Sequence, residues 1–291
     1  MVRNKRISIF LYLFPALLIL VMFVYYPIVR NLGYSFTNWD LMSSTREWIN
    51  LDNYLKLLKA SDFKISFINN IRYVVISLIF QVGGALIFAA MVENLKNRRL
   101  SAVYRTTFFL PSLISLTIIG LMFTFIYNNE GLLNGFLKLV GLGAYTKGWL
   151  GNSGTAIYAV IAVSQWRSIG YTMMLLIVAI QRIPREIFEA ARIDGASAFR
   201  IFKDITIPNI SGMLKIALMI NIAGGFLVFN EIFIMTSGGP YGSSQVLSTL
   251  MYDYAFIHGK VGYAAAIANV ILVISFLFLL PQLFVKSKNE T

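Results

Sequence analysis

Residues 181–208 read QRIPREIFEAARIDGASAFRIFKDITIP and separate two long apolar stretches, Ala156–Ile180 and Gly212–Met235. Pro184 is suited to begin a helix, because the backbone nitrogen at that position has no intrahelical partner in any case. Gly195 is suited to end this helix, because glycine readily adopts the left-handed conformation. A second short helix is expected after the glycine, ended by the proline that closes the quoted segment. The pattern therefore predicts two short helices around a glycine.

Working outward from this segment, six apolar stretches are long enough to cross a bilayer, which takes about 20 residues per helix. Backbone groups in lipid must be paired within the chain, so each stretch is predicted to be helical. The expected fold is an all-α membrane protein with six transmembrane helices in one transmembrane domain, residues 1–291. The predicted spans are 7–29, 71–92, 107–127, 156–180, 212–235 and 262–285, and the loop between the fourth and fifth is 181–211.

Composition supports a membrane protein and excludes several other classes. The chain is 57% hydrophobic and only 13% charged, whereas soluble domains are about 25% charged. The absence of Cys and the presence of a single His exclude disulfides, Cys-based zinc sites and His-rich metal sites. The net charge of +12 comes from 25 Lys and Arg against 13 Asp and Glu. These basic residues are dispersed over many loops, so nucleic acid is not an expected partner.

The distribution of Lys and Arg predicts how the chain crosses the membrane. Short loops on one side are densely basic, as in the group Lys96, Arg98, Arg99 and Arg105. The positive-inside rule places these loops, and with them both termini, in the cytoplasm. The first apolar stretch is longer than the core of a signal peptide and is expected to be retained as a helix.

Motifs for catalysis or nucleotide binding are missing from the sequence. It contains neither the Gly-rich Walker loop that cradles ATP phosphates nor the Gly-x-Ser-x-Gly and His-Glu-x-x-His patterns of hydrolases. The spans carry only two charged residues away from their ends, Arg167 and Glu231. The chain is therefore predicted not to be an enzyme and to bind no cofactor or metal itself.

The segment between the fourth and fifth spans resembles a known family. Glu189-Ala190-Ala191, Asp194-Gly195-Ala196 and Pro208 are similar to the EAA loop of permease subunits from bacterial ABC importers, in the carbohydrate-uptake branch. The family usually has leucine where Ile207 stands. Further resemblances are Leu51-Asp52-Asn53-Tyr54, Leu110-Pro111, Gly131-Leu132-Leu133-Asn134, Thr236-Ser237-Gly238-Gly239-Pro240 and Tyr263-Ala264-Ala265-Ala266. Together they extend over almost the whole chain.

The resemblance implies the type I importer permease fold in the bacterial cytoplasmic membrane. It implies four kinds of partner: a second homologous permease, a pair of ATPase subunits that bind ATP and Mg, an extracytoplasmic binding protein, and the sugar which that protein delivers. It also implies that the EAA loop docks on the ATPase subunits. The residues carried over for this coupling are Glu189, Ala190, Ala191, Asp194, Gly195 and Pro208.

Candidate solute contacts follow from polar and aromatic residues within the spans, because polar groups in a membrane are costly and mark functional sites. The candidates in the fourth span are Gln165, Trp166, Ser168 and Tyr171, and those in the fifth are Asn221, Gly225 and Glu231. The alternative for each is contact between helices.

Two questions stay open at the level of sequence. Arg167 is expected to pair with another helix or with the partner permease rather than with solute. A polyol or a glycerol-phosphate-type solute is the alternative to a sugar. A phosphorylated solute would require a more cationic lining than Arg167 alone provides.

Overall fold

The computed structural model describes residues 2–43 and 45–284, so the predicted end of the last span, Val285, lies outside the described residues. Over this part of the chain the fold is helical without strands, which confirms the predicted class, and an isolated antiparallel bridge joins Thr37 and Trp48. The helices are α1 (Val2–Leu20), η1 (Val21–Tyr25), α2 (Tyr26–Tyr34), α3 (Asp52–Lys59), α4 (Ser61–Ser77), η2 (Leu78–Gly84), α5 (Ala85–Glu93), α6 (Arg98–Leu113), α7 (Leu116–Ile126), α8 (Leu132–Leu139), η3 (Gly143–Tyr145), α9 (Ala156–Ile180), α10 (Arg185–Ile193), α11 (Ala198–Ile201), η4 (Phe202–Thr206), α12 (Ile207–Asn209), α13 (Ser211–Leu227), α14 (Asn230–Met235), α15 (Leu247–Tyr252), η5 (Asp253–Ile257) and α16 (Val261–Phe284).

The chain forms two compact units. One contains the segment up to Ala60 and Leu250–Leu272, and the other contains Ser61–Thr249 and the chain from Val273 onward. In the first unit, the buried amide of Asn53 donates to the carbonyl oxygens of Ser35 and Thr37 at 2.8 and 2.9 Å. These bonds hold helix α3 against the turn that follows α2.

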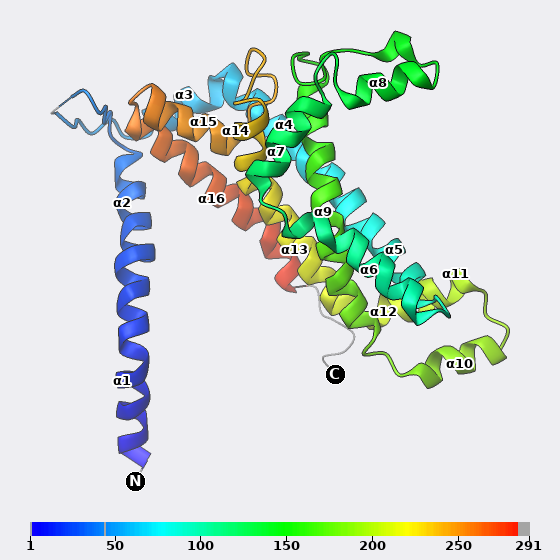
Figure 1. The fold of residues 1–291 in the computed structure, drawn as a ribbon. Coiled ribbons are helices and arrows are strands. Elements are labelled where there is room, and N and C mark those ends of the chain that lie inside the picture. Colours follow the sequence, from blue (N-terminus) through cyan, green and yellow to red (C-terminus); the bar gives the residue numbers. More distant parts are fainter. Residues whose placement is uncertain (1, 44, 285–291) are drawn as a thin grey trace. The chain divides into compact units, whose positions relative to one another are not determined.

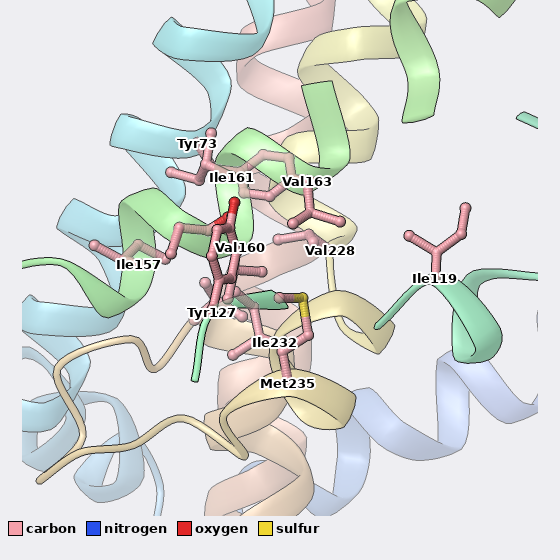
Figure 2. Packing of buried hydrophobic residues seen from close by; sticks show 12 residues of the cluster. Tyr73, Ile119, Tyr127, Ile157, Val160, Ile161, Val163, Val228, Ile232 and Met235 are labelled. Atoms are coloured by element: carbon pink, nitrogen blue, oxygen red, sulfur yellow. The ribbon is translucent and has the colours of Figure 1, made fainter. Parts of the chain in front are cut away.

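The second unit is built around α9. The helices α4, η2 and α5 form one continuous helical segment, Ser61–Glu93, which packs along α9 together with α6 and α13 (Figure 1). A core of buried side chains lies at one end of α9, where residues of α4, α7, α9 and α14 meet around Tyr73, Ile161 and Ile232 (Figure 2). These side chains are apolar or aromatic, and they hold the unit together by van der Waals packing, which associates helices within a membrane.

Helices α6 and α9 cross closely at Gly170. A Cβ atom at this position would lie 1.8 Å from the carbonyl oxygen of Phe108, which is impossible without separating the two helices. Gly225 plays the same part where α13 crosses α4, because a Cβ there would lie 2.5 Å from a methyl group of Val74. Small residues at such crossings are typical of membrane helices, because they allow the backbones to approach.

Four helices are long and apolar enough to cross a membrane, and the number rises to six if each of two bent pairs counts as one span. The third and fifth predicted spans, 107–127 and 212–235, are not single helices as predicted. Instead, α6 and α7 meet at 94°, and α13 ends before the fifth span is complete. The helix of the first predicted span continues through Pro27 to Tyr34. A π-helical turn, η1, directly precedes the proline and accommodates its missing N–H.

The break between α6 and α7 follows Pro111. Proline has no N–H to donate to the preceding turn, and the hydroxyl of Ser112 donates to the Phe109 carbonyl at 2.6 Å. Ile114 and Ser115 then adopt extended backbone, and the chain changes direction.

The break between α13 and α14 follows from a buried amide on another helix. Asn70 of α4 is fully buried, and its side-chain nitrogen donates to the carbonyl oxygen of Gly225 at 2.7 Å. It also lies 3.4 Å from the Phe226 carbonyl oxygen. These carbonyls would otherwise accept bonds from the next turn of α13. Val228 instead has ψ of 128°, and the helix ends at Leu227.

Candidate functional site

A cavity of about 340 Å³ opens in the second unit between α4–η2, α9, α13 and the link to α14. Its volume lies at the lower end of the range for small-molecule sites, about 300–1,000 Å³. Five of the residues proposed from the sequence line it. These are Ser168, Tyr171, Asn221, Gly225 and Glu231. The polar residues of the fourth and fifth spans thus meet at one site because α9 and α13 pack side by side.

The other two candidates lie elsewhere. Gln165 is buried, and its amide donates to the hydroxyl of Ser77 at 3.2 Å and to the carbonyl of Ile161 at 3.1 Å. Trp166 is partly exposed, and its ring packs against Phe123 with the centroids 5.4 Å apart. Neither residue lines the cavity, so their contact with solute stays a prediction.

The second span supplies one wall that sequence reasoning missed. Tyr73, Ser77 and Gln81 line the cavity from α4 and η2. The hydroxyl of Tyr73 is hydrogen-bonded to that of Ser164 on α9. These three residues recur every four positions, which places them on one helical face. That spacing of polar side chains was visible in the sequence and could have identified this wall.

The polar groups of the cavity are hydroxyls and amides with one carboxylate, and apolar side chains such as Leu116, Ile220 and Phe229 complete the lining. Among the described residues, Glu231 is the charged side chain in the lining. Tyr171 of α9 adds a partly exposed aromatic ring. Hydroxyls and amides both donate and accept hydrogen bonds, so the lining is suited to an uncharged, hydroxyl-rich solute. The described residues contain no cluster of three His, Cys, Asp or Glu side chains that could hold a metal ion.

Arg167 does not line the cavity. It is half-buried, and its Nε atom is enclosed without a hydrogen-bond partner in the part of the chain that the structure describes. Its charge attracts that of Glu231, but the two groups are not within ion-pair distance. A buried guanidinium nitrogen without a partner is costly.

The segment that joins α9 to α13 forms two short helical runs around Gly195, as predicted. Pro184 precedes α10 directly, and Gly195 has φ of +77°. The N–H of Ala196 donates to the Ala191 carbonyl at 2.9 Å, and that of Gly195 donates to Arg192 at 3.1 Å. This bond pair is the Schellman motif, which satisfies the last carbonyls of a helix.

The prediction that Pro208 ends the second helix is wrong. The helical run continues from Ala198 through Pro208 to Asn209. A π-helical turn, η4, precedes the proline, and the side-chain amide of Asn209 donates to the Ile205 carbonyl at 2.7 Å. The proline is therefore tolerated in the first turn of α12. The chain instead bends by 76° after Asn209, where α13 begins.

The residues carried over for coupling lie mostly at the surface. Glu189, Ala190, Asp194 and Gly195 are exposed, whereas Ala191 and Pro208 are half-buried. Large apolar side chains accompany them. Ile193 is 86% exposed and Phe199 is 72% exposed. An apolar surface outside the membrane spans requires a partner.

An acidic residue at the end of α5 anchors this segment, and the sequence reasoning did not identify it. Glu93 forms an ion pair with Arg105 of α6 and accepts a hydrogen bond from Gln181, which follows α9, at 3.2 Å. Next to it, Asn94 accepts a hydrogen bond from Arg192 of α10 at 3.3 Å. A groove of about 790 Å³ lies between these residues and α10. Three helices are thus joined where the exposed segment leaves the bundle.

Comparison with known proteins identifies relatives over the full length of the chain. The family described as binding-protein-dependent transport system inner membrane component matches residues 81–288. A probable ABC transporter permease protein, YurN of Bacillus subtilis, is 46% identical over 100% of both chains. The trehalose/maltose transport system permease protein MalF of Thermococcus litoralis is 30% identical, over 92% of this chain and 90% of its own.

Solved structures show the same fold. A chain from a bacterial ABC transporter involved in the import of the acidic polysaccharide alginate superposes with a TM-score of 0.85. It is 21% identical, and the match covers 99% of this chain and 98% of that chain. A second chain, from an alginate transporter in complex with a periplasmic protein bound to an alginate pentasaccharide, superposes with a TM-score of 0.84 over 96% of this chain.

Proposed function

Because the chain belongs to the family of binding-protein-dependent transport system inner membrane components, we propose that it forms part of the solute pathway of an importer driven by separate ATPase subunits. One observation carries this proposal. The two helices that line the cavity, α9 and α13, are joined by the exposed segment with its apolar residues. A partner that moves this segment also moves two walls of the cavity.

Within this segment, each carried-over residue has a proposed role. Ala190 and Ala191 leave room for close approach of the ATPase, and Glu189 pairs with a basic group on it. Asp194 and Gly195 shape the turn, and Pro208 lies in the helical run that leads to the bend before α13. The anchor at Glu93 transmits force from α10 to the ends of α5 and α6.

The proposed solute is a sugar or oligosaccharide delivered by an extracytoplasmic binding protein. Relatives include permeases named for trehalose/maltose and for lactose. The hydroxyls and amides of the cavity can exchange hydrogen bonds with sugar hydroxyls, and the Tyr171 ring offers an apolar face. A polyol would satisfy the same groups. A phosphorylated solute is disfavoured, because Glu231 would repel its charge and Arg167 lies outside the lining.

The proposed membrane arrangement has six spans, with each bent helix pair counted as one. We propose that both termini and the segment between α9 and α13 lie in the cytoplasm, and the basic loops on that side support this. A second homologous permease then completes the pathway, and two ATPase subunits bind ATP and Mg. We assign the assembly to the bacterial cytoplasmic membrane.

Isolation of the tagged chain from its native membrane in mild detergent tests this proposal. We expect mass spectrometry to find one different permease and two ATPase copies per chain. Ile193→Glu places a charge on the exposed apolar face of α10 and should remove the ATPase while leaving the second permease. Ile193→Met keeps the face apolar and serves as the control.

Two results would contradict the coupling role. One is recovery of the chain without ATPase even when nucleotide is trapped on the complex. The other is normal ATPase recovery with Ile193→Glu. If the complex forms as expected, its copurified binding protein can be screened against sugars, polyols and their phosphates.

A further inference from the structure

The short helix α8 presents its apolar side outward. It follows α7 and precedes the loop that leads to α9 (Figure 1). Leu132 is 76% exposed, Phe136 60% and Leu139 87%. At about 100° per residue these three side chains share one face. The opposite face carries Asn134, which is 1% exposed. Leu133 also faces inward and packs against the core. The helix is thus apolar on both sides, whereas an ordinary surface helix turns a polar side to water.

Asn134 fixes this orientation. Its amide nitrogen donates to the carbonyl oxygens of Asn128, Asn129 and Lys147 at 3.2, 3.1 and 2.9 Å. Its oxygen accepts a hydrogen bond from the indole of Trp149 at 2.9 Å. All the hydrogen-bonding groups of this amide are directed inward. A rotation of the helix that buried Phe136 would break these bonds, so the outward apolar face is built into the fold.

The position of α8 relative to the spans indicates what covers this face. Gly131 packs under the last turn of α7, where a Cβ atom would lie 2.4 Å from the carbonyl oxygens of Phe125 and Ile126. At the other end of the loop, the hydroxyl of Thr155, directly before α9, donates to the Trp149 carbonyl at 2.8 Å. The helix is therefore held beside the ends of α7 and α9.

The loop around α8 does not belong in hydrocarbon. Residues 140–155 contain turns and a 3₁₀ turn, and lipid-exposed irregular backbone does not occur within the bilayer core. The helix thus lies at the boundary between the membrane and water. Lys138 is exposed there, and the ammonium group of Lys147 lies 5.2 Å from the centre of the Trp149 ring. Basic and amphipathic aromatic residues are typical of the headgroup region.

We propose that α8 is an interfacial anchor, with its apolar face inserted among phospholipids and its lysines near anionic headgroups. Amphipathic helices of this kind enter the headgroup and acyl boundary by about 5–10 Å. The inference rests on the chain crossing a membrane and not on the solute it carries. Failure of this proposal would therefore leave the proposed transport function intact.

The chain has no Cys, so a single introduced cysteine can be spin-labelled, and the wild-type chain supplies the background. The variants Phe136→Cys and Leu139→Cys report on the apolar face. Ser153→Cys is the control in an exposed turn of the same loop. The full chain, isolated with its subunits, is placed in vesicles of phosphatidylethanolamine and phosphatidylglycerol. The accessibility of each label to oxygen and to a water-soluble nickel chelate is then measured.

We expect the ratio of oxygen to nickel accessibility to be several-fold higher at positions 136 and 139 than at 153. In phosphatidylcholine vesicles the ratio should fall at the first two positions, because the attraction to anionic lipid is lost. Nickel accessibility equal to that of Ser153→Cys would mean that the face meets water. Exclusion of both reagents would mean that a protein covers it. Either outcome overturns the membrane anchor, and an unchanged ratio in phosphatidylcholine overturns its preference for anionic lipid.

Discussion

At the scale of the single residue, Gly195 shows how backbone conformation constrains the segment between α9 and α13, for which we propose a coupling role. Its φ of +77° lies in the left-handed region, which costs most other residues about 1–2 kcal/mol. There is space for a side chain, because no atom lies within 4 Å of the position of a Cβ. The constraint at this position is therefore conformational and not steric.

Two substitutions of Gly195 separate conformation from side-chain size. Gly195→Val should lower the population of the native turn roughly tenfold. It should therefore lower both the uptake of solute and the recovery of the ATPase with the chain. Gly195→Asn should retain most of both, because asparagine tolerates this conformation. Uptake by reconstituted complexes provides the measurement. Equal loss with both variants would show that the surface itself, and not the turn, requires glycine.

At the scale of the element, the end of α13 depends on a side chain from α4. The Asn70 amide donates to the Gly225 carbonyl, and its oxygen accepts a hydrogen bond from the N–H of Leu247 at 2.9 Å. The helix ends here, and the link to α14 brings Glu231 into the cavity. If the fifth span were one continuous helix, the residues after Leu227, Glu231 among them, would face other directions.

We therefore expect Asn70→Ala to destabilise the protein and to impair solute transport. The substitution leaves the buried Gly225 carbonyl and Leu247 N–H without their partner. This should lower the free energy of unfolding by about 1–3 kcal/mol. Asn69→Ala is the matched control, because Asn69 is equally buried but donates to Ser243 and Gln245 in the following loop. Thermal unfolding and solute-dependent ATP hydrolysis are measured for both. A loss of hydrolysis of the same size in both variants would contradict a specific role for the break in α13.

At the scale of the whole molecule, the enclosed Nε of Arg167 has no hydrogen-bond partner in the described part of the chain, and we propose that the second permease supplies one. Because Arg167 does not line the cavity, we expect Arg167→Leu to reduce recovery of the second permease severalfold. Arg167→Lys keeps the charge and should show a smaller loss. The ratio of the two permeases after isolation is the measurement. Intact assembly with reduced solute-dependent ATP hydrolysis would instead assign Arg167 to the solute.

The sequence by itself determined the helical class and the limits of helix α10. In lipid, the backbone N–H and C=O groups of a long apolar run must form hydrogen bonds within the chain, so such a run is helical. Pro184 and Gly195 mark the ends of α10 because their backbone preferences act locally. The sequence identified Ser168, Tyr171 and Asn221 as polar residues within spans, and all three line the cavity. Such residues mark functional sites because burying a polar side chain in a membrane is costly.

Only the tertiary structure decided where the helices break and which side chains meet. The end of α13 is set by Asn70, some 155 residues away along the chain, and no local pattern around Leu227 shows it. Gln165 donates a hydrogen bond to Ser77 and does not line the cavity. Helix α8 turns Leu132, Phe136 and Leu139 outward because Asn134 is bonded inward. Hydrogen bonds between distant segments compete with local preferences in all three cases. Their outcome depends on packing that a single sequence does not display.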